Sequence, residues 1–212
     1  MKTKLTIIVV LLLAVASCQQ KPKSRIEERF EQYIQRNFVN PSDYKGIADI
    51  EHTDSFDFQS VSKDVLSIAD SLNGILVVKM DSLSKSRAKS EYSSGLDGII
   101  KDLEFQVLWM KYSNAIVNDS LRKDSIDAIL KMYEPSMFVT QSYTLKVKID
   151  GNTEITPYYA LDCALIDSVY YSPSPIKKSV LPSPLLSLSG LIDRCLEDNN
   201  KRINLIAEID KH

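Results

Sequence analysis

Few side chains in this sequence have the types and spacing that catalysis or metal binding requires. The chain has two histidines, and one of them, His212, is the last residue. The other, His52, forms an H-x-D pair with Asp54, but a zinc site takes at least three protein ligands. Because Phe56 and Phe58 share the expected strand face with His52, we interpret this histidine as lying at the margin of a core. We therefore expect no metal and no other cofactor.

Two short motifs match the S-x-x-K pattern of a serine nucleophile, Ser60–Lys63 and Ser82–Lys85. The penicillin-binding proteins that use this pattern also need S-D-N and K-T-G elements, and the sequence contains neither. The pair Asp162/Asp167 could supply an acid and a base, but a chain with 28 acidic residues contains many such pairs. We therefore expect a protein that is not an enzyme.

The N-terminal segment carries the most specific signal in the sequence. Lys2 and Lys4 precede an apolar run of 12 residues, 5–16, whereas a membrane-spanning helix needs about 20. A positive start, a short apolar stretch and small residues before a cleavage point are typical of a secretory signal peptide. The run ends in Val15-Ala16-Ser17-Cys18, and this tetrad resembles the lipobox of bacterial lipoproteins.

This resemblance implies a covalent membrane anchor. Residues 1–17 would be removed as a signal peptide, and the thiol of Cys18 would accept a diacylglyceryl group. In that family the freed amine often takes a third acyl chain. One buried chain gives only marginal membrane binding, whereas two or three hold a soluble domain at the bilayer surface. Residues 18–24 would then form a lipidated tether, with the membrane as the first binding partner.

The residue after the lipidated cysteine bears on localisation. In Gram-negative lipoproteins an aspartate at that position tends to retain the protein at the inner membrane, and this chain has Gln19 there. The residues that follow contain no acidic cluster of the kind that exports some lipoproteins to the cell surface. The resemblance therefore implies an outer-membrane protein on the periplasmic face.

Composition narrows the range of partners for the mature chain. Hydrophobic residues make up 44% of the sequence, which is ordinary for a globular protein. Loss of Lys2 and Lys4 changes the net charge from −2 to −4. Because the charges are interspersed and no basic patch stands out, we expect no nucleic-acid partner.

Two cysteines remain after lipidation, Cys163 and Cys195. The periplasm permits disulfides, and closing a loop of about 30 residues would stabilise the fold by roughly 3.5–4 kcal/mol in the chain-entropy model. Cys163 falls on the apolar phase of an expected strand and Cys195 on that of an expected helix, which also suits two buried free thiols. The sequence leaves both states open.

Hydrophobic spacing predicts the elements that would position these residues. Ser24 and Glu27 form a capping box at the start of a helix over 24–39, which Asn40-Pro41 ends. Residues 46–58 alternate between apolar and polar side chains, as in a strand. We expect the helix to pack on the sheet to which this strand belongs.

A helical insertion is predicted over about 61–133. Its first helix contains the turn-forming pair Asn73-Gly74, so we expect an interruption there. A turn at Tyr92–Gly95 separates it from a second long helix that starts at Leu96, and a separate short helix follows over 126–133. Long helices joined by a short turn should pair antiparallel.

The clearest strand signals lie in 137–165, where two alternating runs flank a turn at 150–152. They predict an antiparallel hairpin with one buried and one solvated face. In the pairs Tyr158-Tyr159 and Tyr170-Tyr171 we expect one ring to be buried and the other exposed. Since tyrosine is enriched at interfaces, we take Tyr158 and Tyr170 as a possible contact surface.

The C-terminal part begins with a proline-rich connector over 172–186, and two further helices are expected after it. This order predicts an α+β fold with one domain over 25–212. The helix 24–39, the stretch "NPSDYKGI" and the hairpin 137–165 resemble small envelope lipoproteins of cystatin-like architecture, in which a curved antiparallel sheet cradles an N-terminal helix. This resemblance implies a shape and not an activity.

Together these features predict a membrane-anchored envelope lipoprotein without catalytic activity. We expect it to bind an envelope protein or to act as an accessory subunit, facing the periplasm. The first alternative is a carrier of a small ligand, with a pocket between sheet and helices. The second alternative is a hydrolase.

Overall fold

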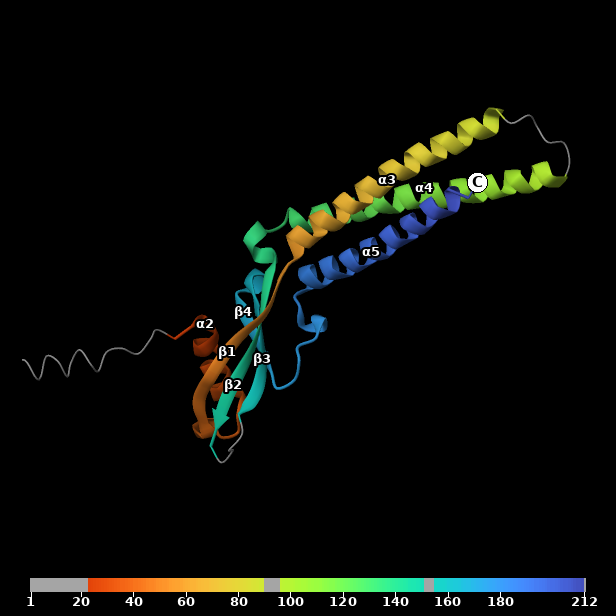
Figure 1. Cartoon of the computed structure of the whole chain (residues 1–212). Coiled ribbons are helices and arrows are strands. Elements are labelled where there is room, and N and C mark those ends of the chain that lie inside the picture. Colours follow the sequence, from red (N-terminus) through yellow and green to blue (C-terminus); the bar gives the residue numbers. More distant parts are fainter. Residues whose placement is uncertain (1–22, 90–95, 151–154, 212) are drawn as a thin grey trace, which may run out of the picture.

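The computed structural model describes residues 23–89, 96–150 and 155–211 of the chain. Its elements confirm the predicted α+β class, because a helix precedes an antiparallel sheet and further helices pack beyond it (Figure 1). The helices are α2 (Arg25–Asn37), α3 (Phe58–Lys89), α4 (Leu96–Leu130) and α5 (Ser183–Ile209). The strands are β1 (Tyr44–Asp57), β2 (Val139–Ile149), β3 (Thr156–Cys163) and β4 (Ser168–Ser172). Short 3-10 turns cover Pro41–Asp43, Pro135–Phe138, Ala164–Ile166 and Lys178–Val180.

Helix α2 begins where the capping box predicts. The hydroxyl of Ser24 accepts a hydrogen bond from the amide of Glu27 (3.3 Å), and the Glu27 carboxylate accepts one from the amide of Ser24 (2.6 Å). Each side chain thus satisfies a backbone donor that the first turn leaves without a partner. The helix ends at Asn37, shortly before Asn40-Pro41.

The sheet has the strand order β1-β2-β3-β4, and all neighbouring strands are antiparallel. One face of α2 packs on it and closes the first hydrophobic core, which we call the sheet core. Its buried members are Ile26, Phe30, Ile34, Leu145, Val147, Tyr158 and Ala160. The predicted packing of the N-terminal helix on the sheet is therefore confirmed.

The apolar face expected for β1 is wrong beyond its first half. The pairing of β1 with β2 has three register shifts, and each shift changes which side of the sheet the following side chains occupy. The shift between His52 and Asp54 puts Phe56 on the other side of the sheet from Ile50, and Phe56 is exposed. His52 follows Ile50 in unbroken register and lies on the same side, but it is also exposed on this edge strand. Phe58, predicted at the end of the strand, is the buried first residue of α3.

The prediction of one buried and one solvated face for the hairpin is also only partly right. Tyr158 and Ala160 of β3 point into the sheet core, but Leu161 and Cys163 on the other face are buried as well. They belong to a second cluster, the junction core, where the sheet meets the helices. Its buried members are Phe58, Val65, Leu66, Ile126, Phe138, Leu161, Cys163, Leu181, Leu185, Leu188, Ile192 and Cys195.

Helices α3, α4 and α5 run side by side and extend away from the sheet, forming a unit that we call the stalk (Figure 1). Each is longer than predicted. Helix α3 continues through Asn73-Gly74 without interruption, α4 includes most of the short helix expected over 126–133, and α5 is one helix instead of two. The turn expected at Tyr92–Gly95 lies outside the described residues.

A buried polar network explains why α3 does not break at Asn73. The guanidinium of Arg202 on α5 is 1% exposed and bonds the Asp119 carboxylate of α4 (2.8 Å) and the Asn73 side-chain carbonyl of α3 (2.9 Å). It also donates to the Asn199 side chain (2.8 Å) and to the Ala115 carbonyl (3.2 Å). The side-chain amide of Asn73 in turn donates to the carboxylate of Asp119 (2.7 Å). These contacts outweigh the local turn preference of Asn-Gly.

Replacing the buried cation should destabilise the stalk severely. In Arg202→Met the carboxylate of Asp119 stays buried without its charge partner, so we expect a loss of about 3–5 kcal/mol in the free energy of unfolding. Urea unfolding followed by circular dichroism measures this loss. Arg194→Met, at an exposed position of the same helix, is the control and should change stability by less than about 0.5 kcal/mol. Equal effects of the two variants would contradict the role of the network.

Candidate binding surfaces

The expected lipidation site, Cys18, lies outside the described residues. Cys163 and Cys195 are free thiols, so the possible disulfide between them is not formed. Both are almost fully buried in the junction core, where each packs as a small apolar side chain. Burial raises the pKa of both thiols, which disfavours the reactive thiolate.

These two cysteines should resist alkylation in the native state. We expect iodoacetamide at mildly alkaline pH to modify neither thiol in Cys18→Ser protein, and to modify both in concentrated urea, because unfolding removes the burial that raises their pKa. Mass spectrometry of the intact protein counts the added groups. Ser120→Cys, at an exposed position of α4, is the positive control. Rapid native labelling of Cys163 or Cys195 would contradict the buried placement.

The tyrosines proposed as a contact surface lie differently from the expectation. Tyr158 is 8% exposed and its ring packs edge-on against Phe30 (5.4 Å between centroids), because α2 covers this side of the sheet. The expected exposure of Tyr158 is therefore wrong, and burial raises the pKa of its phenol. Tyr170 is half-buried beside the junction core, while the Tyr171 hydroxyl donates to the Ile26 carbonyl (2.8 Å).

His52 and Asp54, the pair considered for metal binding, each have another partner in the structure. The exposed ring of His52 lies edge-on to Tyr143 (5.2 Å between centroids). Its neighbour Asp54 accepts a hydrogen bond from the amide of Ser55 (2.8 Å). Across the part of the chain that the structure describes, three or more His, Cys, Asp or Glu side chains nowhere gather so that they could hold a metal ion.

The two S-x-x-K motifs lie on α3, where their polar groups have structural partners. The amide of Ser60 donates to the Asp57 carboxylate (3.1 Å), which caps the start of the helix. In the second motif the ammonium group of Lys85 pairs with Asp81, one turn earlier. These contacts give the Ser60 backbone amide and the Lys85 ammonium group a role in the helix.

Asp162 and Asp167 do lie in one cluster, through Arg25 and Arg29 of α2. The Arg25 guanidinium contacts Asp167 (2.6 Å) and Asp162 (3.2 Å), and Arg29 contacts Asp167 (3.2 Å) and donates to its carbonyl (2.6 Å). These contacts attach α2 to the β3–β4 turn. Sequence reasoning considered the acids and missed the arginines, although their i, i+4 spacing places both on one side of the helix.

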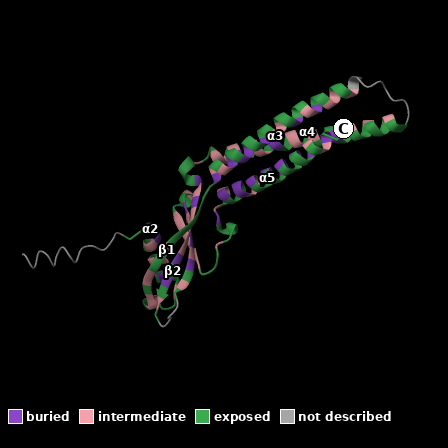
Figure 2. Cartoon of the chain, viewed as in Figure 1, coloured by how far each residue is buried: buried purple, intermediate pink, exposed green. Residues whose placement is uncertain are grey.

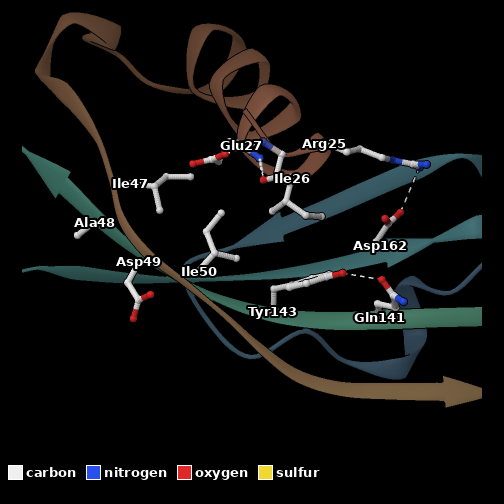
Figure 3. A pocket seen from close by; sticks show the side chains of 11 residues that line it. Arg25, Ile26, Glu27, Ile47, Ala48, Asp49, Ile50, Gln141, Tyr143 and Asp162 are labelled. Atoms are coloured by element: carbon white, nitrogen blue, oxygen red, sulfur yellow. Dashed lines mark hydrogen bonds and ion pairs between the residues drawn. The ribbon is translucent and has the colours of Figure 1, made fainter. Parts of the chain in front are cut away.

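One groove of about 640 Å³ lies between the start of α2 and strands β1 and β2 (Figure 3). Its lining comprises Ser24, Arg25, Ile26, Glu27, Ile47, Ala48, Asp49, Ile50, Gln141, Tyr143 and Asp162. Several of its polar groups already have partners within the protein. Glu27 caps α2, Asp162 binds Arg25, Asp49 binds Lys146 (2.8 Å), and Tyr143 donates to Gln141 (2.5 Å). The groove is therefore mainly an apolar surface with satisfied polar edges.

The second candidate surface is the outside of the stalk (Figure 2). Large apolar side chains that the periodicity places on the packing face of α4 are instead exposed, among them Leu96, Leu103 and Met110, at 56–78%. On α3 the exposed apolar residues include Ile68 and Val78. On soluble proteins, large apolar side chains exposed next to one another mark interaction sites.

Comparison with known proteins does not indicate a function, so the function is inferred from the geometry. No protein-family model, curated protein or solved structure matches the chain. Among the helices of the described ranges, none combines the length and apolar character that crossing a bilayer requires. The groove and the exposed face of the stalk are thus the two surfaces from which a function can be argued.

Proposed function

We propose that this chain is a lipid-anchored outer-membrane protein that binds an envelope protein on the periplasmic side and catalyses no reaction. The observation that carries the proposal is the exposed apolar surface of the stalk. A soluble domain gains nothing from leaving such side chains in water, since burying one stabilises by about 1.5–3 kcal/mol. A partner protein that covers the stalk would supply this burial.

The arrangement of the fold supports an anchor at one end and a binding surface at the other. Helix α2, which follows the proposed tether, lies beside the sheet, whereas the end of α3 and the start of α4 lie at the opposite extremity (Figure 1). At 1.5 Å per residue the 32 residues of α3 span about 48 Å. A lipid on Cys18 would hold the sheet near the bilayer and leave the stalk free to reach a partner.

The tether itself would keep the domain close to the membrane. Five residues separate Cys18 from Ser24, so even a fully extended tether spans only about 21 Å between the two. Helix α2 does not need the bilayer to cover its apolar face, because Ile26, Phe30 and Ile34 are buried against the sheet. Its polar side carries Glu27, Glu28 and Glu31, which anionic lipid would repel.

Loss of the thiol at position 18 should abolish the anchor. In cells given a labelled fatty acid, we expect the chain without substitutions to carry the label and to lie in the outer-membrane fraction. Cys18→Ser should lose the label and leave that fraction, because no thiol remains to take the lipid. Cys163→Ser is the control, since Cys163 is buried, and it should keep the label. Label that persists on Cys18→Ser would refute the proposed anchor.

The groove beside α2 favours a second candidate function, the transport of a small ligand. Its volume of about 640 Å³ lies within the usual range of ligand pockets, and Ile26, Ile47 and Ile50 line it. An amphipathic small molecule would suit this lining. Native mass spectrometry of protein extracted gently from membranes tests the idea. A bound small molecule that disappears in Ile50→Arg would favour the carrier over the protein-binding function.

A further inference from the structure

Helix α4 carries a second apolar face whose spacing follows a heptad pattern. Starting at Leu96, the positions alternate in steps of four and three residues over eight consecutive sites. We call this set the α4 stripe: Leu96, Ile100, Leu103, Val107, Met110, Asn114, Val117 and Leu121. It spans nearly four heptads, the length at which such a repeat indicates a coiled coil.

The α4 stripe is not the face that packs inside the stalk. The buried residues of α4 are Leu108, Asp119 and Ile126, and they face α3 and α5. At 3.6 residues per turn, the stripe lies roughly 130° around the helix from them. Exposure confirms the separation, since the apolar members of the stripe range from 44% exposed (Val107) to 78% exposed (Leu96). Helix α4 therefore has one apolar face for its own chain and another left in water.

The residue types of the α4 stripe select a partner geometry. If Leu96 occupies a d position, the a positions are Ile100, Val107, Asn114 and Leu121. The d positions are then Leu96, Leu103, Met110 and Val117. In the first half of the stripe the a positions are β-branched and the d positions are leucine, a combination that favours two parallel strands, and a single asparagine at a fixes register and pairing state. In a parallel pair in register, two Asn114 amides face each other and can hydrogen-bond. In the antiparallel register that aligns the whole stripe, Asn114 would face Leu103.

We infer that α4 pairs with α4 of a second copy of this chain as a parallel, two-stranded coiled coil. The stripe is about 37 Å long, which with a helix width of about 10 Å covers roughly 370 Å² per copy, within the range of the largest apolar patch on a typical monomer, which is often functional. The flanking g positions, Ile99, Gln106, Ser113 and Ser120, carry no charge, so parallel pairing brings no like charges together. The identical stripe on the second copy supplies the complementary surface.

This pairing goes beyond the proposed function and does not depend on lipidation: it assigns the α4 stripe to a second copy and leaves the exposed apolar residues of α3, such as Ile68 and Val78, for an envelope partner. It is compatible with an anchor, because two parallel α4 helices place both sheets, and hence both tethers, at the same end. A single membrane could then hold both copies. An antiparallel pair would put the two sheets at opposite ends of the stalk.

Cysteine cross-linking of the full lipidated chain in membranes tests the pairing. In Asn114→Cys, a parallel coiled coil brings the two new thiols to within disulfide distance, so mild oxidation should convert most of the protein to a covalent dimer on a non-reducing gel. Lys101→Cys is the matched control, because residue 101 is exposed on α4 but lies away from the stripe. It should stay monomeric. The same result in Cys18→Ser protein would separate pairing from anchoring.

Separate results would contradict the parallel orientation of the two α4 helices and the identity of the partner on the stripe. A dimer that forms only when Leu103→Cys and Asn114→Cys are combined would show an antiparallel pair and reject the parallel one. Attachment of Asn114→Cys only to a different protein would show that a foreign helix covers the stripe. In native mass spectrometry, Val107→Asp should halve the mass of the assembly while its circular dichroism stays unchanged. If the protein without substitutions is a monomer in native mass spectrometry, the inference is wrong.

Discussion

The guanidinium of Arg202 has to find its hydrogen-bond acceptors inside the stalk, because it is 1% exposed. A buried cation is tolerated only when a charge partner and further acceptors surround it, and here they come from all three helices. In the observed register Asn73, Asp119 and Asn199 meet that need. The network therefore links α3, α4 and α5 in the register in which their other faces remain outside.

The same alignment divides the molecule into a base and a stalk. The sheet core fastens α2 to the sheet, and the junction core joins the sheet to the first turns of α3 and α5. Beyond the junction the stalk has little apolar interior, with Leu76, Met80, Leu108, Leu205 and Ile209 as its buried members. A polar network in the middle and a thin core towards the tip leave many apolar side chains on the outside. This surface is what makes binding, and self-pairing through α4, the activity that the geometry supports.

Most of the polar side chains that could take part in a reaction have structural roles in this fold. Arg25 and Arg29 hold Asp162 and Asp167 at the seam between α2 and the sheet, and Asp57 caps α3. The described residues include no buried side-chain nitrogen or oxygen that lacks a hydrogen-bond partner. These hydrogen bonds satisfy the buried polar groups of the fold, as is usual in native structures.

Local sequence determined the features whose physics is local: the capping box of α2, the three C-terminal strands and the helical character of 58–130 and 183–209. It also indicated the second long helix that starts at Leu96, but not that one of its apolar faces lies in water. Only the tertiary structure decided the rest, because contacts distant in sequence outweigh local preferences. His52 is exposed on the edge strand β1, α2 buries Tyr158, Arg202 bonds Asn73 of the uninterrupted α3, and the junction core encloses Cys163 and Cys195 as free thiols.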